Sequence, residues 1–233
     1  ESAYYKNGIE NDNIYFPNFL GITSTKTHNP YDITKAKQLL REAGYYDRNG
    51  NGLLQDVTGQ TITVNILVNS EDQSRVAAAQ IIKEGLDQLP VQTTITSVDW
   101  NAYNSGLASG KFDIYLGGYQ IKENYDLRFL LYSGGNQIGY SNPALDSLLD
   151  RMQSALSPTD RQNVYTQIRD ILNDDLPYFC LLYKTYGAIA SPALKSEIDP
   201  TFVNLYQGAD KWYAMLEVIQ KQPEEPTGDQ TGY

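Results

Sequence analysis

Cysteine, histidine and long apolar runs are scarce in this 233-residue sequence, which contains one cysteine and one histidine. A single cysteine excludes an internal disulfide. Cys180 lies in the apolar segment PYFCLLY, which favours a buried side chain over a nucleophile. Because a membrane-spanning helix needs roughly 18 or more consecutive apolar residues, the sequence predicts no membrane span. No signal peptide or initiator methionine opens the chain, and we expect it to be a piece of a longer protein.

Basic residues are also few: 18 lysines and arginines stand against 28 aspartates and glutamates, for a net charge of −10. They form no basic cluster, which argues against a nucleic-acid partner. Tyrosine, in contrast, is abundant, with 19 residues. Tyrosine can line a binding cleft, because its ring supplies apolar area and its hydroxyl a directed hydrogen bond. The alternative is that these rings pack at core edges and on the surface.

Motifs for hydrolytic catalysis are missing. His28 is the only histidine, and no Gly-x-Ser-x-Gly or His-Glu-x-x-His pattern occurs. The paired carboxylates Asp174-Asp175 and Glu224-Glu225 lie at an expected helix end and in the tail, where solvated charge is the better interpretation. We therefore predict that the protein is not an enzyme.

Hydrophobic periodicity predicts helices that alternate with strands, as is typical of an α/β fold. Expected helices run from the N-cap Asp32 to the stop at Gly44 and over 72–89, 100–109, 143–156 and 158–174, the last with Ser157 as its N-cap and Pro158 in its first turn. The first of these helices should have one apolar face, formed by Ala36, Leu39, Leu40 and Ala43. Expected strands cover 61–68, 91–98, 112–119 and 178–190, and the first should be buried on both faces. We expect one α/β lobe over residues 1–220, opened by an irregular arm over 1–31. The acidic tail 221–233 has almost nothing to bury and is predicted to be disordered.

Aromatic and polar side chains follow two of the expected strands. Trp100 comes shortly after the strand 91–98, and Tyr119 ends the strand 112–119. In open α/β sheets, ligands bind beyond the carboxyl ends of the strands. The predicted ligand-binding residues are Trp100, Tyr103, Tyr119, Lys122, Glu123, Asn124 and Asp126. For Trp100 the alternative is a packing role between helix and sheet.

The segment DRNGNGLLQD imitates a calcium-binding loop. Oxygen ligands at alternate positions can converge on one hard cation, and Gly52 provides the sharp turn. The candidate ligands are Asp47, Asn49, Asn51 and Asp56. Thr58 stands where a bidentate glutamate would be expected, so any calcium affinity should be weak. The alternative is a hydrogen-bonded Asx-turn loop without metal.

Four segments occur in order between residues 31 and 186: YDITKAKQLLREAGYYDRNGNG, VDWNAYNSGLASGKFDIYLGGY, GYSNPALDSLLDRM and DRQNVYTQIRDILNDDLPYFCLLY. The ordered set resembles the C-terminal lobe of the family 5 extracellular solute-binding proteins, the oligopeptide-, dipeptide- and nickel-binding receptors of ABC importers. The resemblance implies a type II periplasmic-binding-protein-like α/β lobe, with a mixed sheet flanked by helices. A second lobe would complete the cleft.

The resemblance also implies a function. A monomeric receptor would capture a small solute, foremost an oligopeptide, and deliver it to ABC permease subunits in the membrane. It would work on the extracellular face or in the periplasm, anchored as a lipoprotein in its full-length form. The family holds a peptide's amino terminus with an acid shortly after Gly-Trp; here Gly118-Tyr119 matches, but Lys122 takes the acid's place beside Glu123. An oligosaccharide receptor of the same fold and a calcium-binding surface or adhesion module stay open as alternatives.

Overall fold

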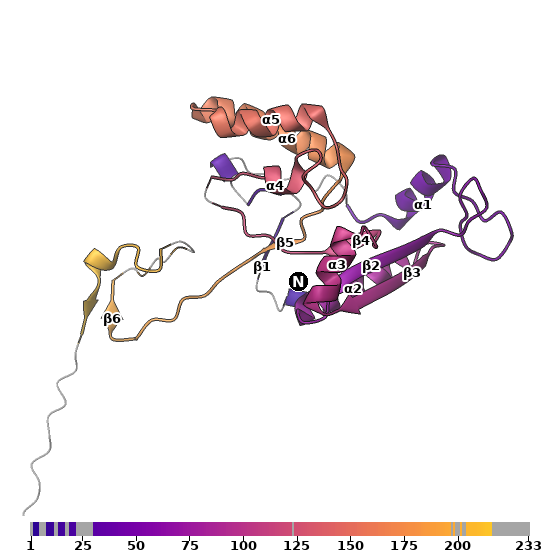
Figure 1. Cartoon of the computed structure of the whole chain (residues 1–233). Helices are drawn as coiled ribbons and strands as arrows, with labels where there is room; N and C mark the ends of the chain where they lie inside the picture. Colours follow the sequence, from indigo (N-terminus) through magenta and orange to yellow (C-terminus); the bar gives the residue numbers. More distant parts are fainter. Residues whose placement is uncertain are drawn as a thin grey trace, which may run out of the picture. The chain divides into compact units, whose positions relative to one another are not determined.

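The computed structural model describes residues 2–4, 8–11, 14–16, 19–21, 30–122, 124–196, 198, 201 and 204–215. The chain forms two compact units, Glu1–Lys184 and Thr185–Tyr233, which Figure 1 colours along the sequence. The boundary at Lys184 falls earlier than residue 220, where the sequence predicts the lobe to end. His28 and the predicted tail 221–233 lie outside the described residues.

The N-terminal arm contains three short elements: the 3-10 turns η1 (Ser2–Tyr4) and η2 (Phe19–Gly21) and the strand β1 (Gly8–Glu10). Two of its rings are buried, Tyr15 and Phe19, and they stack with their centroids 4.6 Å apart. Both rings join the core formed by the later helices. This part of the arm is therefore built into the first unit, although its sequence predicts irregular structure.

A three-stranded parallel sheet forms one layer of the first unit, in the order β3-β2-β4. Its strands are β2 (Thr63–Asn69), β3 (Gln92–Val98) and β4 (Ile114–Leu116). The central strand is β2, and its residues Ile66, Leu67 and Val68 are buried. This confirms the prediction that the first long strand is covered on both faces.

Antiparallel pairing occurs outside this sheet. In the first unit β1 pairs with β5 (Leu182–Lys184), and in the second unit β6 (Leu194–Lys195) pairs with β7 (Tyr213–Ala214). Parallel and antiparallel ladders thus lie in separate sheets and not in the single mixed sheet that the sequence suggests. Two observed strands are also shorter than expected: β4 ends before Gly117, and β5 covers only the residues that β1 can pair.

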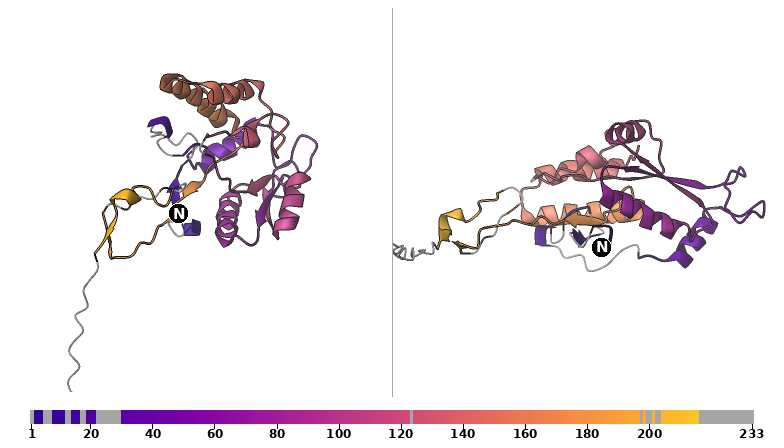
Figure 2. Two further views of the ribbon diagram at one scale, coloured as in Figure 1. Left: turned by 60° about the vertical axis from the view of Figure 1, so that its left-hand side comes forward. Right: turned by 90° about the horizontal axis from the view of Figure 1, so that it is seen from below.

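One helix covers each face of the parallel sheet (Figure 2). Alternate residues of a strand point to opposite faces. Ile66 and Val68 accordingly pack in one cluster with residues of α2 (Gln73–Leu86), whereas Leu67 packs with residues of α3 (Trp100–Ala108). The α/β layering predicted from the sequence is confirmed.

Short polar side chains begin most of the described helices. Asp32 accepts a hydrogen bond from the backbone N–H of Lys35 at the start of α1 (Ile33–Glu42), at 2.9 Å, as its sequence predicts. Gly44 follows α1 with a positive φ of 89°. The predicted apolar face of α1, however, contains no buried residue, and Leu39 is 53% exposed.

Three further helices form a second core in the first unit. They are α4 (Arg128–Leu131), α5 (Pro143–Ser154) and α6 (Pro158–Asp175). The pair α5 and α6 lies side by side at the top of Figure 1. Ser157 caps α6 with Pro158 in the first turn, as predicted, and Leu176 ends it in the left-handed conformation at φ 47°. The short helix α4 was not predicted.

The described part of the second unit consists of β6, β7 and the 3-10 turn η3 (Ala209–Lys211). It exposes several large apolar side chains: Tyr186, Ile189, Leu205, Tyr206, Tyr213 and Met215. Among the residues that the structure describes, no helix has the length and apolar character needed to cross a membrane.

Candidate ligand-binding site

The carboxyl ends of all three parallel strands meet at one edge of the sheet. Asn69, Val98 and Leu116 end these strands, and the backbone N–H of Ser70 donates to the carbonyl of Val98 at 2.7 Å. The segments that follow the strands carry the predicted aromatic residues. This edge is where parallel sheets place their ligands.

Trp100 and Tyr103 form two layers at this edge. The Trp100 side chain is 50% exposed and stacks on the Tyr103 ring, with centroids 5.6 Å apart and planes inclined by 21°. Tyr103 is only 3% exposed and donates its hydroxyl proton to the carbonyl of Leu116 at 3.0 Å. Burial raises the pKa of Tyr103 to about 12. Trp100 therefore keeps half of its side chain exposed, whereas Tyr103, predicted as a ligand contact, is buried and packs against Trp100.

Tyr119 lies at the same edge, three residues after β4, and its side chain is 42% exposed. Its ring lies beside Phe129, with centroids 5.7 Å apart. Its hydroxyl oxygen is 2.7 Å from that of Tyr115, and the Tyr115 hydroxyl donates to Tyr178 at 3.1 Å. Tyr115 and Tyr178 were not predicted from the sequence, because Tyr115 lies inside a strand and Tyr178 comes from a distant part of the chain.

Gly118 and Arg75 approach each other closely at this edge. A Cβ atom at Gly118 would lie 2.5 Å from the Nη2 atom of Arg75. Asp72 holds Arg75, with its carboxylate 3.2 Å from Nε. Glycine thus allows the loop after β4 to lie against a guanidinium, which the sequence analysis did not include in the site.

A second overlooked polar group is Asn69, at the end of the central strand. Its side chain is 3% exposed, and its Nδ2 atom has no hydrogen-bond partner among the described residues. Its Oδ1 atom accepts from the backbone N–H of Glu71 at 3.2 Å. A buried amide donor without a partner is energetically costly.

The predicted polar residues after Tyr119 do not all face a ligand. Lys122 and Asn124 are exposed, and Glu123 lies outside the described residues. Asp126 instead binds Arg128: the carboxylate accepts from the guanidinium at 2.7 and 2.9 Å and from the Arg128 backbone N–H at 3.0 Å. These hydrogen bonds from Arg128 hold the pKa of Asp126 below its ordinary value. The hydrogen bonds of the Asp126 carboxylate are therefore made within the protein.

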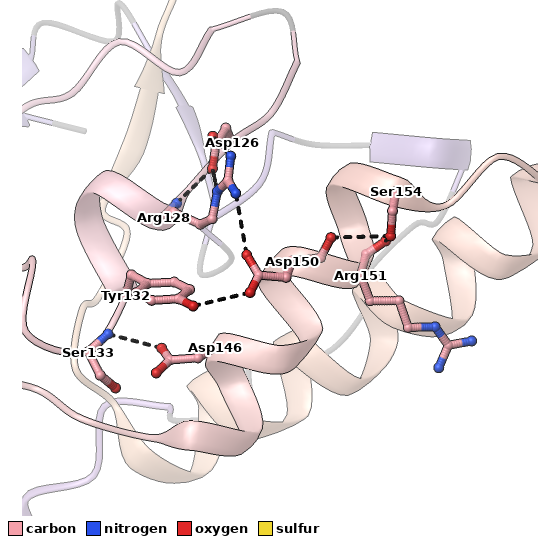
Figure 3. Close-up of polar contacts among 8 residues, drawn as sticks. All are labelled: Asp126, Arg128, Tyr132, Ser133, Asp146, Asp150, Arg151 and Ser154. Atoms are coloured by element: carbon pink, nitrogen blue, oxygen red, sulfur yellow. Dashed lines mark hydrogen bonds and ion pairs between the residues drawn. The ribbon is translucent and has the colours of Figure 1, made fainter.

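Figure 3 shows that the Asp126–Arg128 pair continues into a network. Arg128 also contacts the Asp150 carboxylate at 3.3 Å, and the Tyr132 hydroxyl donates to Asp150 at 3.1 Å. The backbone N–H of Ser133 donates to Asp146 at 2.9 Å. The network connects α4 and the loop before it to α5, which is a structural role.

The candidate calcium loop forms a set of Asx turns. The Asp47 carboxylate accepts from three backbone N–H groups, those of Gly50, Asn51 and Gly52, at 2.7, 3.1 and 2.9 Å. Gly50 and Gly52 have φ values of 73° and 85°, which glycine adopts without strain. Asn49 Oδ1 accepts from the Asn51 backbone N–H at 3.1 Å. These turns match the hydrogen-bonded loop that the sequence left open as an alternative.

The remaining two candidate ligands are bonded in a similar way. Asn51 Oδ1 accepts from the Leu53 backbone N–H at 2.9 Å. Asp56 Oδ1 accepts from the Thr58 hydroxyl at 2.7 Å and from the Thr58 backbone N–H at 2.8 Å, and the hydroxyl contact is the main cause that lowers the Asp56 pKa. In the part of the chain that the structure describes, no three His, Cys, Asp or Glu side chains are grouped so as to hold a metal ion.

Comparisons with known proteins show which family the chain belongs to. Residues 1–140 match the family model described as "Bacterial extracellular solute-binding proteins, family 5 Middle". The oligopeptide-binding protein AppA of Bacillus subtilis is 29% identical over 163 residues, covering 66% of this chain and 29% of AppA. The di/tripeptide-binding protein 4 of Pseudomonas aeruginosa is 24% identical over 177 residues, covering 72% of this chain and 31% of that protein. The chain thus spans about a third of the length of these relatives.

Solved structures show the same fold. AppA of B. subtilis in complex with a nonapeptide superimposes with a TM-score of 0.70 at 21% identity, covering 92% of this chain and 44% of AppA. A mannohexaose-bound periplasmic oligopeptide-binding protein of Thermotoga maritima has a TM-score of 0.62 at 25% identity, covering 76% of this chain and 35% of that chain. The predicted periplasmic-binding-protein fold is confirmed. Since the family match covers more than half of the sequence, the chain belongs to the family 5 bacterial extracellular solute-binding proteins.

Proposed function

We propose that the chain is one lobe of the substrate-binding component of an ABC importer and captures oligopeptides outside the membrane. Family membership supports a solute-binding role, and curated relatives carry the names oligopeptide-binding and di/tripeptide-binding protein. The single observation that carries the proposal is the pair of half-exposed rings, Trp100 and Tyr119, at the carboxyl edge of the parallel sheet. Flat apolar faces beside a few polar groups are what a small-molecule site requires.

The one-lobe proposal has separate support. The chain covers 44% of AppA in the structural comparison, which leaves room for a second lobe on the other side of the ligand. In this proposal, lobe closure brings a second surface onto Trp100 and Tyr119 and excludes water from the ligand. The receptor is a monomer without catalytic activity, anchored as a lipoprotein, and it delivers its solute to permease subunits.

An oligosaccharide is the second candidate ligand. The T. maritima relative was solved with mannohexaose, and aromatic rings such as Trp100 and Tyr119 can stack on sugars as well as on peptide side chains. Moreover, Asp126 is paired with Arg128 and is not free to hold an ammonium group. Peptide remains the first proposal because the curated relatives named above are peptide-binding proteins.

Native mass spectrometry of the full-length protein as purified tests the function. We expect co-captured peptides of a few residues; bound oligosaccharide would favour the second candidate, and a protein that carries no ligand and takes up none from a peptide mixture would contradict capture altogether. With the captured ligand in hand, calorimetry on the double variant Trp100→Ala/Glu123→Gln should show about tenfold weaker binding, about 1.4 kcal/mol. Tyr46→Ala is the matched control, because Tyr46 is similarly exposed, at 49%, but precedes β2 at the opposite edge of the sheet.

A further inference from the structure

The loop before β2 contains two consecutive Asn-Gly pairs, Asn49-Gly50 and Asn51-Gly52. Asparagine is a chemically labile residue. A following glycine makes it more so, because glycine has no side chain to hinder attack by its own backbone nitrogen. All four residues are exposed to water, which the reaction consumes. The loop therefore holds two positions where a side-chain amide can be lost without any enzyme.

The reaction is an attack by the glycine nitrogen on the asparagine side chain. In the first pair, a bond forms between Gly50 N and Asn49 Cγ. The bond between Cγ and Nδ2 breaks, and Nδ2 leaves as ammonia with the proton that the glycine nitrogen loses. Water then opens the cyclic imide at either carbonyl, which leaves aspartate or isoaspartate. Each pair therefore reacts only when its glycine N–H is free to give up its proton.

Asp47 binds both of the N–H groups that have to react. Its Oδ1 atom accepts from Gly50 at 2.7 Å, and its Oδ2 atom accepts from Gly52 at 2.9 Å. Attack by either nitrogen requires its hydrogen bond to break. The carboxylate also opposes the loss of a proton, because a like charge nearby disfavours the anionic form of the nitrogen. One side chain thus restrains both pairs.

The two asparagine side chains are held as well. Asn49 Oδ1 accepts from the backbone N–H of Asn51 at 3.1 Å. Asn51 Oδ1 accepts from the backbone N–H of Leu53 at 2.9 Å and from the side-chain amide of Gln55 at 3.3 Å. Gln55 is fully buried and anchors this part of the loop. The electrophilic carbon and the nucleophilic nitrogen of each pair are therefore both fixed by hydrogen bonds.

We propose that Asn49 and Asn51 are deamidation sites that the Asp47 carboxylate protects in the folded protein. Modification of either asparagine adds a carboxylate close to that of Asp47, and isoaspartate also lengthens the backbone by one carbon. Both changes disturb the turns that Asp47 holds together. This protection is independent of the ligand-binding edge, since the loop precedes β2 and the ligand is proposed to bind after it.

Peptide mapping by mass spectrometry tests the proposal on the full-length protein after incubation at mildly alkaline pH. Wild type should gain aspartate or isoaspartate only slowly at Asn49 and Asn51. Asp47→Ala should accelerate the modification of both asparagines about fivefold or more, because each glycine N–H is released from one hydrogen bond. Folded wild type that reacts as fast as wild type in urea would overturn the proposal, and this comparison needs no variant.

Asp56→Ala is the matched control in the same loop. Its carboxylate accepts from the backbone N–H groups of Thr58 and Gln60, at 2.8 and 2.9 Å. Removing it should leave the rates at both Asn-Gly pairs as in wild type. Equal rates for wild type and Asp47→Ala would contradict protection by Asp47. Equal acceleration by Asp56→Ala would also contradict it, because any loosening of the loop would then be sufficient.

Discussion

The aromatic edge, formed by Trp100 and Tyr119, and the loop from Asp126 to Arg128 use polar side chains in opposite ways. At the sheet edge, Trp100 and Tyr119 are half exposed, and the hydroxyl of Tyr119 is held from within by Tyr115. A few residues later, Asp126 and Arg128 bond each other and connect α4 to α5. The first region leaves aromatic surface exposed, whereas the second pairs its charged groups with each other inside the protein.

This difference shows that a polar loop residue can be judged as a ligand contact only when its partners within the protein are known. In the sequence, residues 119–126 are predicted to form one recognition surface, because charged, amide and aromatic side chains are neighbours there. Whether a charge is available depends on its partner, and Arg128 lies just beyond the predicted loop. The structure therefore separates Asp126, whose carboxylate is paired with Arg128, from the exposed aromatic edge.

The largest expected effect is a difference in stability between a variant of the buried ring of the aromatic edge, Tyr103, and a variant of its exposed ring, Trp100. Tyr103→Ala should lower the free energy of unfolding by about 3 kcal/mol, because it removes a buried ring. Trp100→Ala should cost much less stability, since half of its side chain is exposed. Urea unfolding of both variants measures the difference. Equal losses would mean that Trp100 is a core residue, contrary to its proposed role.

A smaller effect is expected in the paired region. Asp126→Ala should reduce the free energy of unfolding by about 1 kcal/mol, because it removes hydrogen bonds to a partly exposed arginine. Ligand affinity, measured by calorimetry on the full-length protein, should stay within twofold, or about 0.4 kcal/mol, of wild type. A tenfold loss of affinity with little loss of stability would return Asp126 to the binding site.

The loop 47–58 supplies a test of the calcium alternative. Asp47→Ala should lower stability by about 1 kcal/mol, as for the loss of a helix cap, because its carboxylate accepts three backbone N–H groups. Since these bonds need no metal, chelator should leave the melting temperature of wild type nearly unchanged. A drop of many degrees on chelation, restored by calcium, would instead support a calcium-binding module.

The smallest effect is a pH dependence. The pKa of Asp126 is lowered in the folded protein below its ordinary value of 3.8, chiefly by hydrogen bonds from Arg128. Its contribution is therefore present above pH 4 and is lost as the pH falls through the lowered pKa. The stability difference between wild type and Asp126→Asn should shrink between pH 5 and pH 2, as followed by denaturant unfolding. A difference that grows on acidification would contradict the pairing.

Local signals in the sequence were enough to predict much of the fold. The apolar run 61–68 predicted the central strand, and the N-caps Asp32 and Ser157 predicted where two helices begin. The antiparallel strand β5 was overestimated in length, because its partner β1 lies in an arm whose composition suggests no strand. No turn or linker signal in the sequence marks the boundary between the two units at Lys184. This boundary depends on contacts between distant segments.

The candidate site was predicted only in part. The rule that ligands bind beyond the carboxyl ends of parallel strands predicted Trp100 and Tyr119, and the structure places both residues after such strand ends. Tyr178 could not be found in this way, because its hydroxyl meets Tyr115 across 63 positions of the chain. For the same reason, the pairing of Arg128 with Asp150 could not be read from the residues near Asp126.

The most direct test of the account is a crystal structure of the full-length protein with the solute that it captures. We predict that the ligand packs on Trp100 and Tyr119 while the Asp126–Arg128 pair stays intact. A ligand bound by Asp126 after that pair has opened, with the aromatic edge left uncovered, would contradict the account.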